Sequence, residues 1–182
     1  NLNSTKILVT GGAGFIGSHV SRLLIEDGHQ VVILDNLKTG HKSAIPKGAK
    51  FIEGDIADQK KTKLALKGVD AVIHMAGLII VPESVKYPER YFENNVLGAV
   101  SLLESMKESG ARKIIFSSSA FVYGAAKKLP ITEDAPLAPD NPYGATKASV
   151  EAFIQSYHAI YGFDATILRY FNPYGPGELH DP

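Results

Sequence analysis

Two residues with reactive side chains, Tyr143 and Lys147, stand four positions apart in the segment Tyr-Gly-Ala-Thr-Lys. In a helix this spacing places them one turn apart on one face, so that the lysine ammonium lies near the phenol. A nearby cation favours the phenolate, so we expect the pKa of Tyr143 to fall from about 10 towards neutrality, as a general base requires. The alternative is that Tyr143 simply begins the apolar face of an amphipathic helix that continues through Val150 and Ile154.

Three consecutive serines, Ser117, Ser118 and Ser119, follow an apolar run at residues 114–116. Polar side chains at the carboxyl end of a buried strand are costly unless they face a ligand. This triplet favours the catalytic interpretation of Tyr143, because it predicts a site lined by hydroxyl groups.

A glycine-rich turn follows the first apolar run of the chain, with Gly11, Gly14 and Gly17 in a GxxGxxG spacing. The first glycine allows a tight strand-to-helix turn, the second lets the backbone approach a pyrophosphate, and the third allows close packing of helix on strand. Asp35 follows 24 positions after Gly11, where an acid accepts hydrogen bonds from a ribose 2′-hydroxyl and repels a 2′-phosphate. The turn therefore predicts NAD rather than NADP, and the alternative for Asp35 is a cap or turn acid.

Two further pairs of residues stand where a dinucleotide would lie. Asp55 and Ile56, after the third apolar run, can place a carboxylate beside the adenine amino group and an apolar side chain on its ring; a turn aspartate is an equal alternative. Ala76 and Gly77 end the fourth run with small side chains, which allow a cofactor to cross the strand end.

The elements that position these residues are short apolar runs alternating with segments of helical period, which is typical of βαβ units. They predict an α/β fold with a doubly wound parallel sheet that is buried on both faces. The expected strands are residues 6–10, 30–34, 50–53, 71–75, 113–117 and 165–170, and the expected helices are 15–27, 59–67, 88–109 and 142–161, each followed closely by glycine. The proline-rich residues 125–141 are expected to form a loop beside the site.

The composition excludes several classes of function. Lys and Arg total 19, as do Asp and Glu, so no excess positive charge attracts nucleic acid or an anionic membrane. The absence of cysteine fits a reducing cytoplasm, and the six scattered histidines predict no metal site. No apolar run approaches the roughly 20 residues of a spanning helix, so we expect a soluble, unexported protein.

The order and spacing of these motifs resemble the short-chain dehydrogenase/reductases. The segments at 115–124, 141–144 and 168–173 resemble the extended branch of that family, most closely the UDP-glucose 4-epimerases, and the resemblance spans essentially the whole chain. It implies an NAD-binding Rossmann domain over residues 1–171 that carries the catalytic residues. Residues 172–182 would begin a substrate-binding region that is cut short, so that the C-terminal substrate domain is largely absent.

The resemblance also implies a reaction, the NAD-dependent epimerisation at C4 of a UDP-sugar of the UDP-glucose/UDP-galactose type through a transient 4-keto sugar. Tyr143 would be the acid/base, Ser119 the catalytic hydroxyl, and Lys147 both the tuner of Tyr143 and a ribose ligand. The substrate would contact Ser119, Tyr143 and Asn172. The implied cofactor contacts are Gly11, Gly14, Phe15, Ile16, Gly17, Asp35, Asn36, Asp55, Ile56, Ala76, Gly77, Asn95, Ser117, Tyr143, Lys147 and Tyr170.

Departures from the family pattern leave alternatives open. Ile79 stands where close relatives carry lysine, which removes a positive charge near the cofactor phosphates. The segment at 172–177 also resembles relatives that act on UDP-glucuronate or UDP-N-acetylhexosamines, so a UDP-glucuronate epimerase or decarboxylase is an alternative. A 4,6-dehydratase fits less well, because Ala120 and Phe121 follow Ser119 where that reaction needs an acid and a base.

The length of the chain and the habits of relatives give two last expectations. Because the chain stops at Pro182, an inactive NAD-binding fragment is a further alternative. Relatives dimerise through helices that correspond to residues 88–109 and 142–161, so we expect a homodimer.

Overall fold

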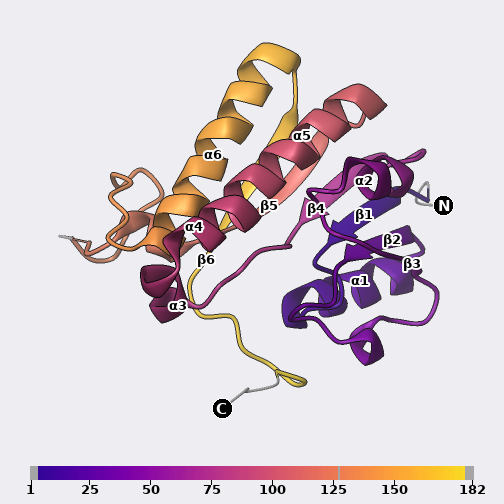
Figure 1. Ribbon diagram of the computed structural model, residues 1–182, viewed down its shortest axis with the longest axis horizontal. Coiled ribbons are helices and arrows are strands. Elements are labelled where there is room, and N and C mark those ends of the chain that lie inside the picture. The colour runs from indigo at the N-terminus through magenta and orange to yellow at the C-terminus, as the bar shows by residue number, and fades with distance from the viewer. Residues whose placement is uncertain (1–3, 127, 179–182) are drawn as a thin grey trace.

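The computed structural model describes residues 4–126 and 128–178. Six parallel strands form one sheet in the order β3-β2-β1-β4-β5-β6 (Figure 1). Their bounds are β1 Lys6–Thr10, β2 Gln30–Asp35, β3 Lys50–Glu53, β4 Ala71–His74, β5 Lys113–Ser119 and β6 Asp164–Tyr170. The chain winds outward from β1 to β3, returns to place β4 on the other side of β1, and winds outward again. The predicted doubly wound α/β fold is confirmed.

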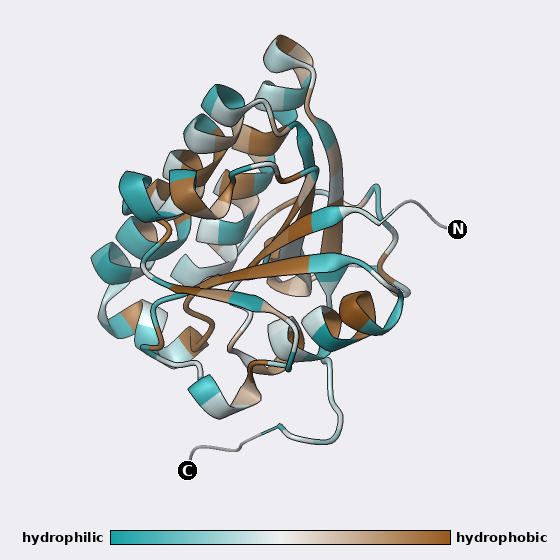
Figure 2. Ribbon diagram, turned by 90° about the vertical axis from the view of Figure 1, so that its right-hand side faces the viewer, coloured by the Kyte–Doolittle hydropathy of each residue, from teal (hydrophilic) through white to brown (hydrophobic). Residues whose placement is uncertain are grey.

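Helices cover both faces of this sheet because alternate side chains of each strand point to opposite faces. Ile7 and Val9 of β1 pack in one apolar cluster with Leu24 of α1, whereas Leu8 packs in a second cluster with Leu102 of α5. The apolar colour of the central strands in Figure 2 marks this double burial. The main helices are α1 Phe15–Glu26 on the first face, and α2 Gln59–Ala65, α5 Gly98–Ser109 and α6 Pro142–Tyr161 on the second.

The outermost strand departs from the expectation of burial on both faces. Along β6 exposed residues alternate with half-buried ones, and Leu168 is 38% exposed. An edge strand has a neighbour on one side only, and among the described residues α6 is the one helix that packs closely against β6. In contrast, β5 extends two residues beyond its predicted end, so that Ser119 is still paired with Tyr170.

The predicted helix at 88–109 is not one regular helix. It consists of α4 Pro88–Tyr91, a π-helical segment η2 Phe92–Leu97, and α5. An unpredicted helix, α3 Val81–Lys86, precedes it, and two 3-10 turns occur at η1 Lys42–Ala44 and η3 Ala120–Tyr123. Elements this short contain too few residues to show a helical period. Residues 125–126 and 128–141 form the expected loop, without helix or strand.

Two kinds of feature are absent from the described part of the chain. None of its helices combines the length and apolar character needed to cross a membrane. It also contains no group of three or more His, Asp or Glu side chains arranged to hold a metal ion.

Candidate functional site

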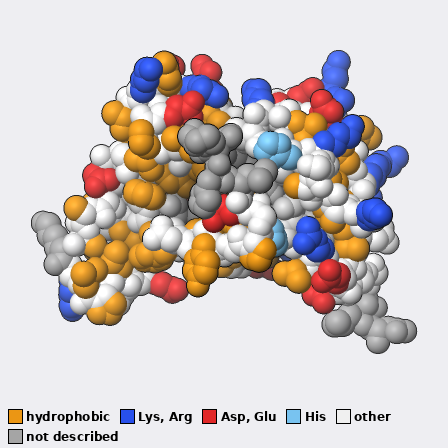
Figure 3. Space-filling view, turned by 90° about the horizontal axis from the view of Figure 1, so that it is seen from below, with side chains coloured by type: hydrophobic (Ala, Val, Ile, Leu, Met, Phe, Trp, Pro, Cys, Tyr) orange, Lys and Arg blue, Asp and Glu red, His pale blue; other side chains and the backbone are white. Residues whose placement is uncertain are grey.

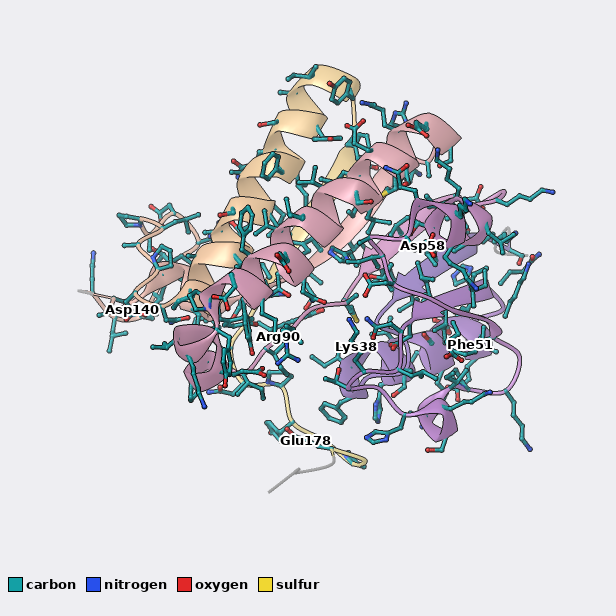
Figure 4. All side chains as sticks on the ribbon, viewed as in Figure 1. Lys38, Phe51, Asp58, Arg90, Asp140 and Glu178 are labelled. Atoms are coloured by element: carbon teal, nitrogen blue, oxygen red, sulfur yellow. The ribbon has the colours of Figure 1, made fainter. Side chains whose placement is uncertain are left out.

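A cleft of about 1080 Å³ opens at the carboxyl ends of the strands. It lies where the chain leaves β1 for one face of the sheet and leaves β4 for the other, the switch point at which open α/β sheets bind ligands. Figure 3 views the molecule from this end, and Figure 4 shows Lys38 and Arg90, which line the cleft from its two sides. Of the predicted site residues the cleft is lined by Gly11, Gly14, Phe15, Ile16, Gly17, Asp35, Asn36, Asp55, Ile56, Ala76, Gly77, Ser117, Ser119, Tyr143, Lys147, Tyr170 and Asn172.

The glycine turn is tight enough to need glycine at two positions. Gly11 has a φ of +70°, and a Cβ on it would stand 2.7 Å from the backbone nitrogen of Ala76. A Cβ on Gly17 would stand 2.2 Å from the carbonyl oxygen of Gly11. After this turn α1 begins at the cleft, with Gly14 as its N-cap. No side chain caps the helix, and its first turn contains no acid. The free N–H groups and the helix dipole of that turn favour an anion.

Asp35 is buried at the end of β2, and it holds the glycine turn as well as lining the cleft. One carboxylate oxygen accepts a hydrogen bond from the Ala13 N–H at 3.0 Å, and the other accepts from the Leu37 N–H at 2.8 Å. The carboxylate therefore holds the turn, as the alternative interpretation expected, and it also borders the cleft, where its contact with a ribose stays a prediction. Each oxygen keeps a second lone pair with which it can accept a ligand hydroxyl.

Asp55 and Asn36 lie together at the same edge of the cleft. The Asn36 amide donates to Asp55 at 2.8 Å, and the Lys38 ammonium lies 3.6 Å from the same carboxylate. Burial raises the pKa of Asp55, but hydrogen bonds from the Ala57 N–H and Asn36, with the charge of Lys38, outweigh it and hold the pKa below its ordinary value. Ile56 is buried beside them and lines the same edge.

Asn95 does not line the cleft but supports one wall of it. Its side-chain oxygen accepts from the Leu78 N–H at 2.8 Å, and its amide donates to the Leu78 carbonyl at 3.0 Å and to the Thr146 hydroxyl at 3.2 Å. The amide oxygen of Asn95 would stand 3.3 Å from a Cβ placed on Gly77. Asn95 thus orients the segment after β4 beside the cleft, and its expected contact with the cofactor stays a prediction.

Ser119, Tyr143 and Lys147 meet at the floor of the cleft. Tyr143 lies in the first turn of α6, which Asn141 caps. The Ser119 hydroxyl accepts from the Phe121 N–H at 3.3 Å and lies near enough to the phenol to lower the pKa of Tyr143. The Lys147 ammonium donates to the Ser117 carbonyl at 2.8 Å and lies 5.8 Å from the centroid of the Tyr143 ring. The predicted proximity of the three side chains is therefore present.

The expected direction of the Tyr143 pKa is wrong for this structure. Burial raises the pKa of Tyr143, and the hydrogen bond with Ser119 offsets that rise only in part. Burial also lowers the pKa of Lys147 to about 8. Both groups lose hydration in the same pocket, so the cost of burying either charge exceeds the benefit that the ammonium gives to the phenolate.

The family of the chain follows from its sequence. Residues 7–182 match the NAD dependent epimerase/dehydratase family. The chain belongs to this family. A UDP-glucose 4-epimerase of Lactobacillus helveticus is 48% identical over 185 residues, covering 97% of this chain and 56% of that protein.

Solved structures of this epimerase/dehydratase family share the fold. The UDP-glucose 4-epimerase from Brucella ovis in complex with NAD has a TM-score of 0.90 at 44% identity, over 93% of this chain and 52% of that one. The UDP-glucose 4-epimerase from Thermotoga maritima with UDP-glucose has a TM-score of 0.91 at 40% identity, over 94% and 57%. The present chain spans about half the length of the relatives it matches.

The three serines of the triplet contact different partners in this epimerase/dehydratase chain. The Ser117 carbonyl receives Lys147 and Ser119 meets Tyr143, whereas the Ser118 hydroxyl donates to the buried Glu151 at 2.5 Å. The polar triplet therefore has two partners of different kinds, the cleft and the protein interior. Residues 179–182 of the predicted substrate-binding region lie outside the described residues.

Several residues that line the cleft were missed in the sequence. Ile80 is the N-cap of α3, Glu83 lies in α3, and Arg90 lies in α4. Glu83 accepts from Arg90 at 2.6 Å and from the Tyr91 hydroxyl at 2.8 Å, which joins the two short helices. Proline early in a helix and acid in its first turn, as in Pro82-Glu83, were the available signals for α3.

Proposed function

We propose that the protein epimerises a UDP-sugar of the UDP-glucose/UDP-galactose type at C4, with NAD, through a transient 4-keto sugar. The observation that carries this is the meeting of Ser119, Tyr143 and Lys147 in the cleft that also receives the open N-terminus of α1. The names of its relatives, UDP-glucose 4-epimerases with NAD or UDP-glucose bound, support the same reaction.

The residues present fit a dinucleotide. The first turn of α1 offers uncapped N–H groups to a pyrophosphate, and a Cβ on Gly14 would stand only 3.3 Å from the Gly11 carbonyl. Asp35 would accept from a ribose 2′-hydroxyl, and Asp55 with Ile56 would border the adenine. When bound, NAD supplies the hydride acceptor for sugar C4 and a positive charge that favours the Tyr143 phenolate.

The chain's own residues would move the proton and orient the sugar. Tyr143 would take the proton of the 4-hydroxyl and return it after the 4-keto sugar has rotated to present its other face. Ser119 would hydrogen-bond the same oxygen. Lys147, whose ammonium donates to the Ser117 carbonyl, would also bind the nicotinamide ribose, and Tyr170 would border that ribose. Asn172, in the exposed segment after β6, would contact the sugar. We therefore place the domain boundary near residue 171.

Turnover of defined substrates tests this function. The protein, incubated separately with UDP-galactose, UDP-glucose and UDP-glucuronate, is expected to interconvert the first two, as followed by NMR of the sugar. Decarboxylation of UDP-glucuronate, or dehydration at C6, without interconversion of the first two would overturn the proposal.

Removing one hydroxyl tests the role of Tyr143. Tyr143→Phe should reduce turnover by roughly 10²-fold to 10⁴-fold, because general acid-base catalysis contributes about that much. NAD affinity, measured by calorimetry, should change little. The control is Tyr161→Phe at the other end of α6, which should keep full activity; an active Tyr143→Phe would contradict the assignment.

We also propose a homodimer located in the cytoplasm. Exposed apolar side chains on neighbouring segments support the dimer, including Phe92 and Leu97 on η2 and Phe153 and Ile160 on α6. A second copy of the chain would cover them. The cytoplasm is supported by the cysteine-free composition, which fits a reducing compartment.

A further inference from the structure

A buried polar network behind the cleft joins the elements that carry the catalytic residues. Glu151 lies on α6, one turn after Lys147, and is 1% exposed. Its carboxylate accepts from Ser118 Oγ at 2.5 Å, from Arg169 Nε at 3.0 Å and from Arg169 Nη2 at 2.7 Å. Ser118 is on β5, and Arg169 is its register partner on β6. One carboxylate therefore ties α6 to two adjacent strands.

The same network extends to the proline-rich loop. Arg169 Nη1 donates to the Tyr123 hydroxyl at 2.7 Å and to the Glu133 carbonyl at 3.0 Å. The Arg169 guanidinium also lies 5.0 Å from the centroid of the Tyr123 ring. Glu151, Arg169 and Tyr123 do not line the cleft formed by the described residues, so they act on it through other groups.

The bond between Ser118 and Glu151 is the middle one of three successive links from β5 to α6. The Ser117 carbonyl accepts from Lys147, the Ser118 hydroxyl donates to Glu151, and the Ser119 hydroxyl lies near enough to Tyr143 to lower the pKa of its phenol. The outer two links involve the catalytic groups, which line the cleft. The middle link is held by a bidentate ion pair of specific geometry, in which the Glu151 side chain is 1% exposed.

We propose that Glu151, held by Arg169, is a positioning residue that fixes the end of β5 against α6 so that Ser119 and Tyr143 stay in contact. A buried carboxylate is costly unless it is fully paired, and here every bond it accepts comes from the strands that carry the site. The kinetic consequence rests on the proposed function, whereas the contact between Ser119 and Tyr143 can be measured without turnover.

Two variants and a matched control test this proposal. Ser118→Ala removes the middle link and leaves the ion pair intact, and Glu151→Gln removes the charge. The control is Ser105→Ala, because Ser105 on α5 is equally buried and its hydroxyl has no hydrogen-bond partner.

The first readout is the ¹³Cζ resonance of Tyr143 at neutral pH, assigned by its loss in Tyr143→Phe. It reports the hydrogen bond of the phenol, and it should move in Ser118→Ala and Glu151→Gln but not in Ser105→Ala. The second readout is kinetic. We expect kcat to fall roughly 10-fold in Ser118→Ala and roughly 100-fold in Glu151→Gln with KM nearly unchanged, since misalignment costs rate rather than binding.

An unmoved Tyr143 resonance in Ser118→Ala overturns the proposal, as does a kcat equal to that of Ser105→Ala. If Glu151→Gln does not fold, the smaller Ser118→Ala change still decides. If the unaltered protein epimerises no UDP-sugar, the proposed function fails, whereas the resonance still settles whether Glu151 and Ser118 hold Ser119 against Tyr143.

Discussion

Asp35 performs two tasks with one carboxylate, and a substitution should separate them. It accepts backbone N–H groups from Ala13 and Leu37 and presents negative charge to the cleft. Asp35→Ala should improve NADP binding relative to NAD by roughly 10-fold or more, because a like-charge contact with the 2′-phosphate disappears. Calorimetric titration with both cofactors measures the ratio.

The control for Asp35→Ala is Asp58→Ala. Asp58 also accepts two backbone N–H groups, but it does so as the N-cap of α2, away from the cleft. Asp58→Ala should cost about 1 kcal/mol of stability and leave the ratio of the two affinities unchanged. An unchanged ratio in Asp35→Ala would show that its carboxylate does not select the cofactor.

Lys147 is a buried charge whose cost should appear in the pH dependence of stability. Burial lowers its pKa from 10.5 to about 8, so between these values the unfolded chain binds more protons and folding becomes more favourable as pH rises. A depression of that size corresponds to about 3 kcal/mol. The unfolding free energy of the unaltered protein, relative to that of Lys147→Met, should therefore rise by about that amount across this range.

Urea unfolding at pH 7 and near pH 10 measures this difference. The exposed Lys60, substituted by Met, is the control and should show a pH profile parallel to that of the unaltered protein. If the pH profile of Lys147→Met ran parallel to that of the unaltered protein, the Lys147 ammonium would be hydrated in the folded protein.

At the level of single residues, the sequence predicted which reactive side chains lie close together, but it did not predict the direction of their pKa shifts. The spacing of Tyr143 and Lys147 predicts their proximity, because helix geometry is local. The direction of the Tyr143 pKa depends on how completely β5 and α6 bury the phenol, which is a property of the assembled fold. The place of Asn95 likewise depends on a residue 17 positions away in sequence, Leu78.

At the level of elements, the contact of α1 with β1 depends on one missing side chain. A Cβ on Gly17 would stand 2.2 Å from the Gly11 carbonyl, so Gly17→Ala must push the helix away from the turn. We expect a loss of roughly 1–3 kcal/mol of stability and at least a roughly 10-fold loss of NAD affinity, measured by unfolding and by calorimetry.

The control is Gly28→Ala, just after the same helix. Gly28 has a φ of +87° and nothing within 4 Å of an added Cβ, so this substitution strains the backbone without moving the turn. It should cost roughly 1 kcal/mol and preserve NAD binding. Equal loss of NAD affinity in both variants would assign the effect to general destabilisation.

The elements that the sequence predicted best are those with strong local signals. Strands of β-branched residues and helices that end at glycine were found nearly at their observed bounds, as with β1 and α6. The segment at 88–109 was misread, because its π-helical region η2 coincides with the attachment of Asn95 to Leu78 and Thr146. Contacts between distant segments of this kind leave no periodic trace in the sequence.

At the level of the whole molecule, α5 and α6 lie side by side (Figure 1), and η2 and α6 carry apolar side chains that the described chain leaves exposed. Phe153 is 41% exposed and Ile160 is 70% exposed on α6. Burying large apolar side chains is a main source of association energy, so these helices are expected to meet their counterparts in a second copy.

Phe153→Glu tests this arrangement, because it places a charge in the proposed contact and should weaken dimerisation by at least roughly 10-fold. Light scattering after size exclusion, over a dilution series, should give twice the chain mass for the unaltered protein and a shift towards single chains for the variant. The control is Leu23→Glu on α1, which removes an even more exposed apolar side chain from the opposite face of the sheet and should leave the dimer intact. A single-chain mass for the unaltered protein at all concentrations, or equal dissociation of both variants, would exclude η2 and α6 as the interface.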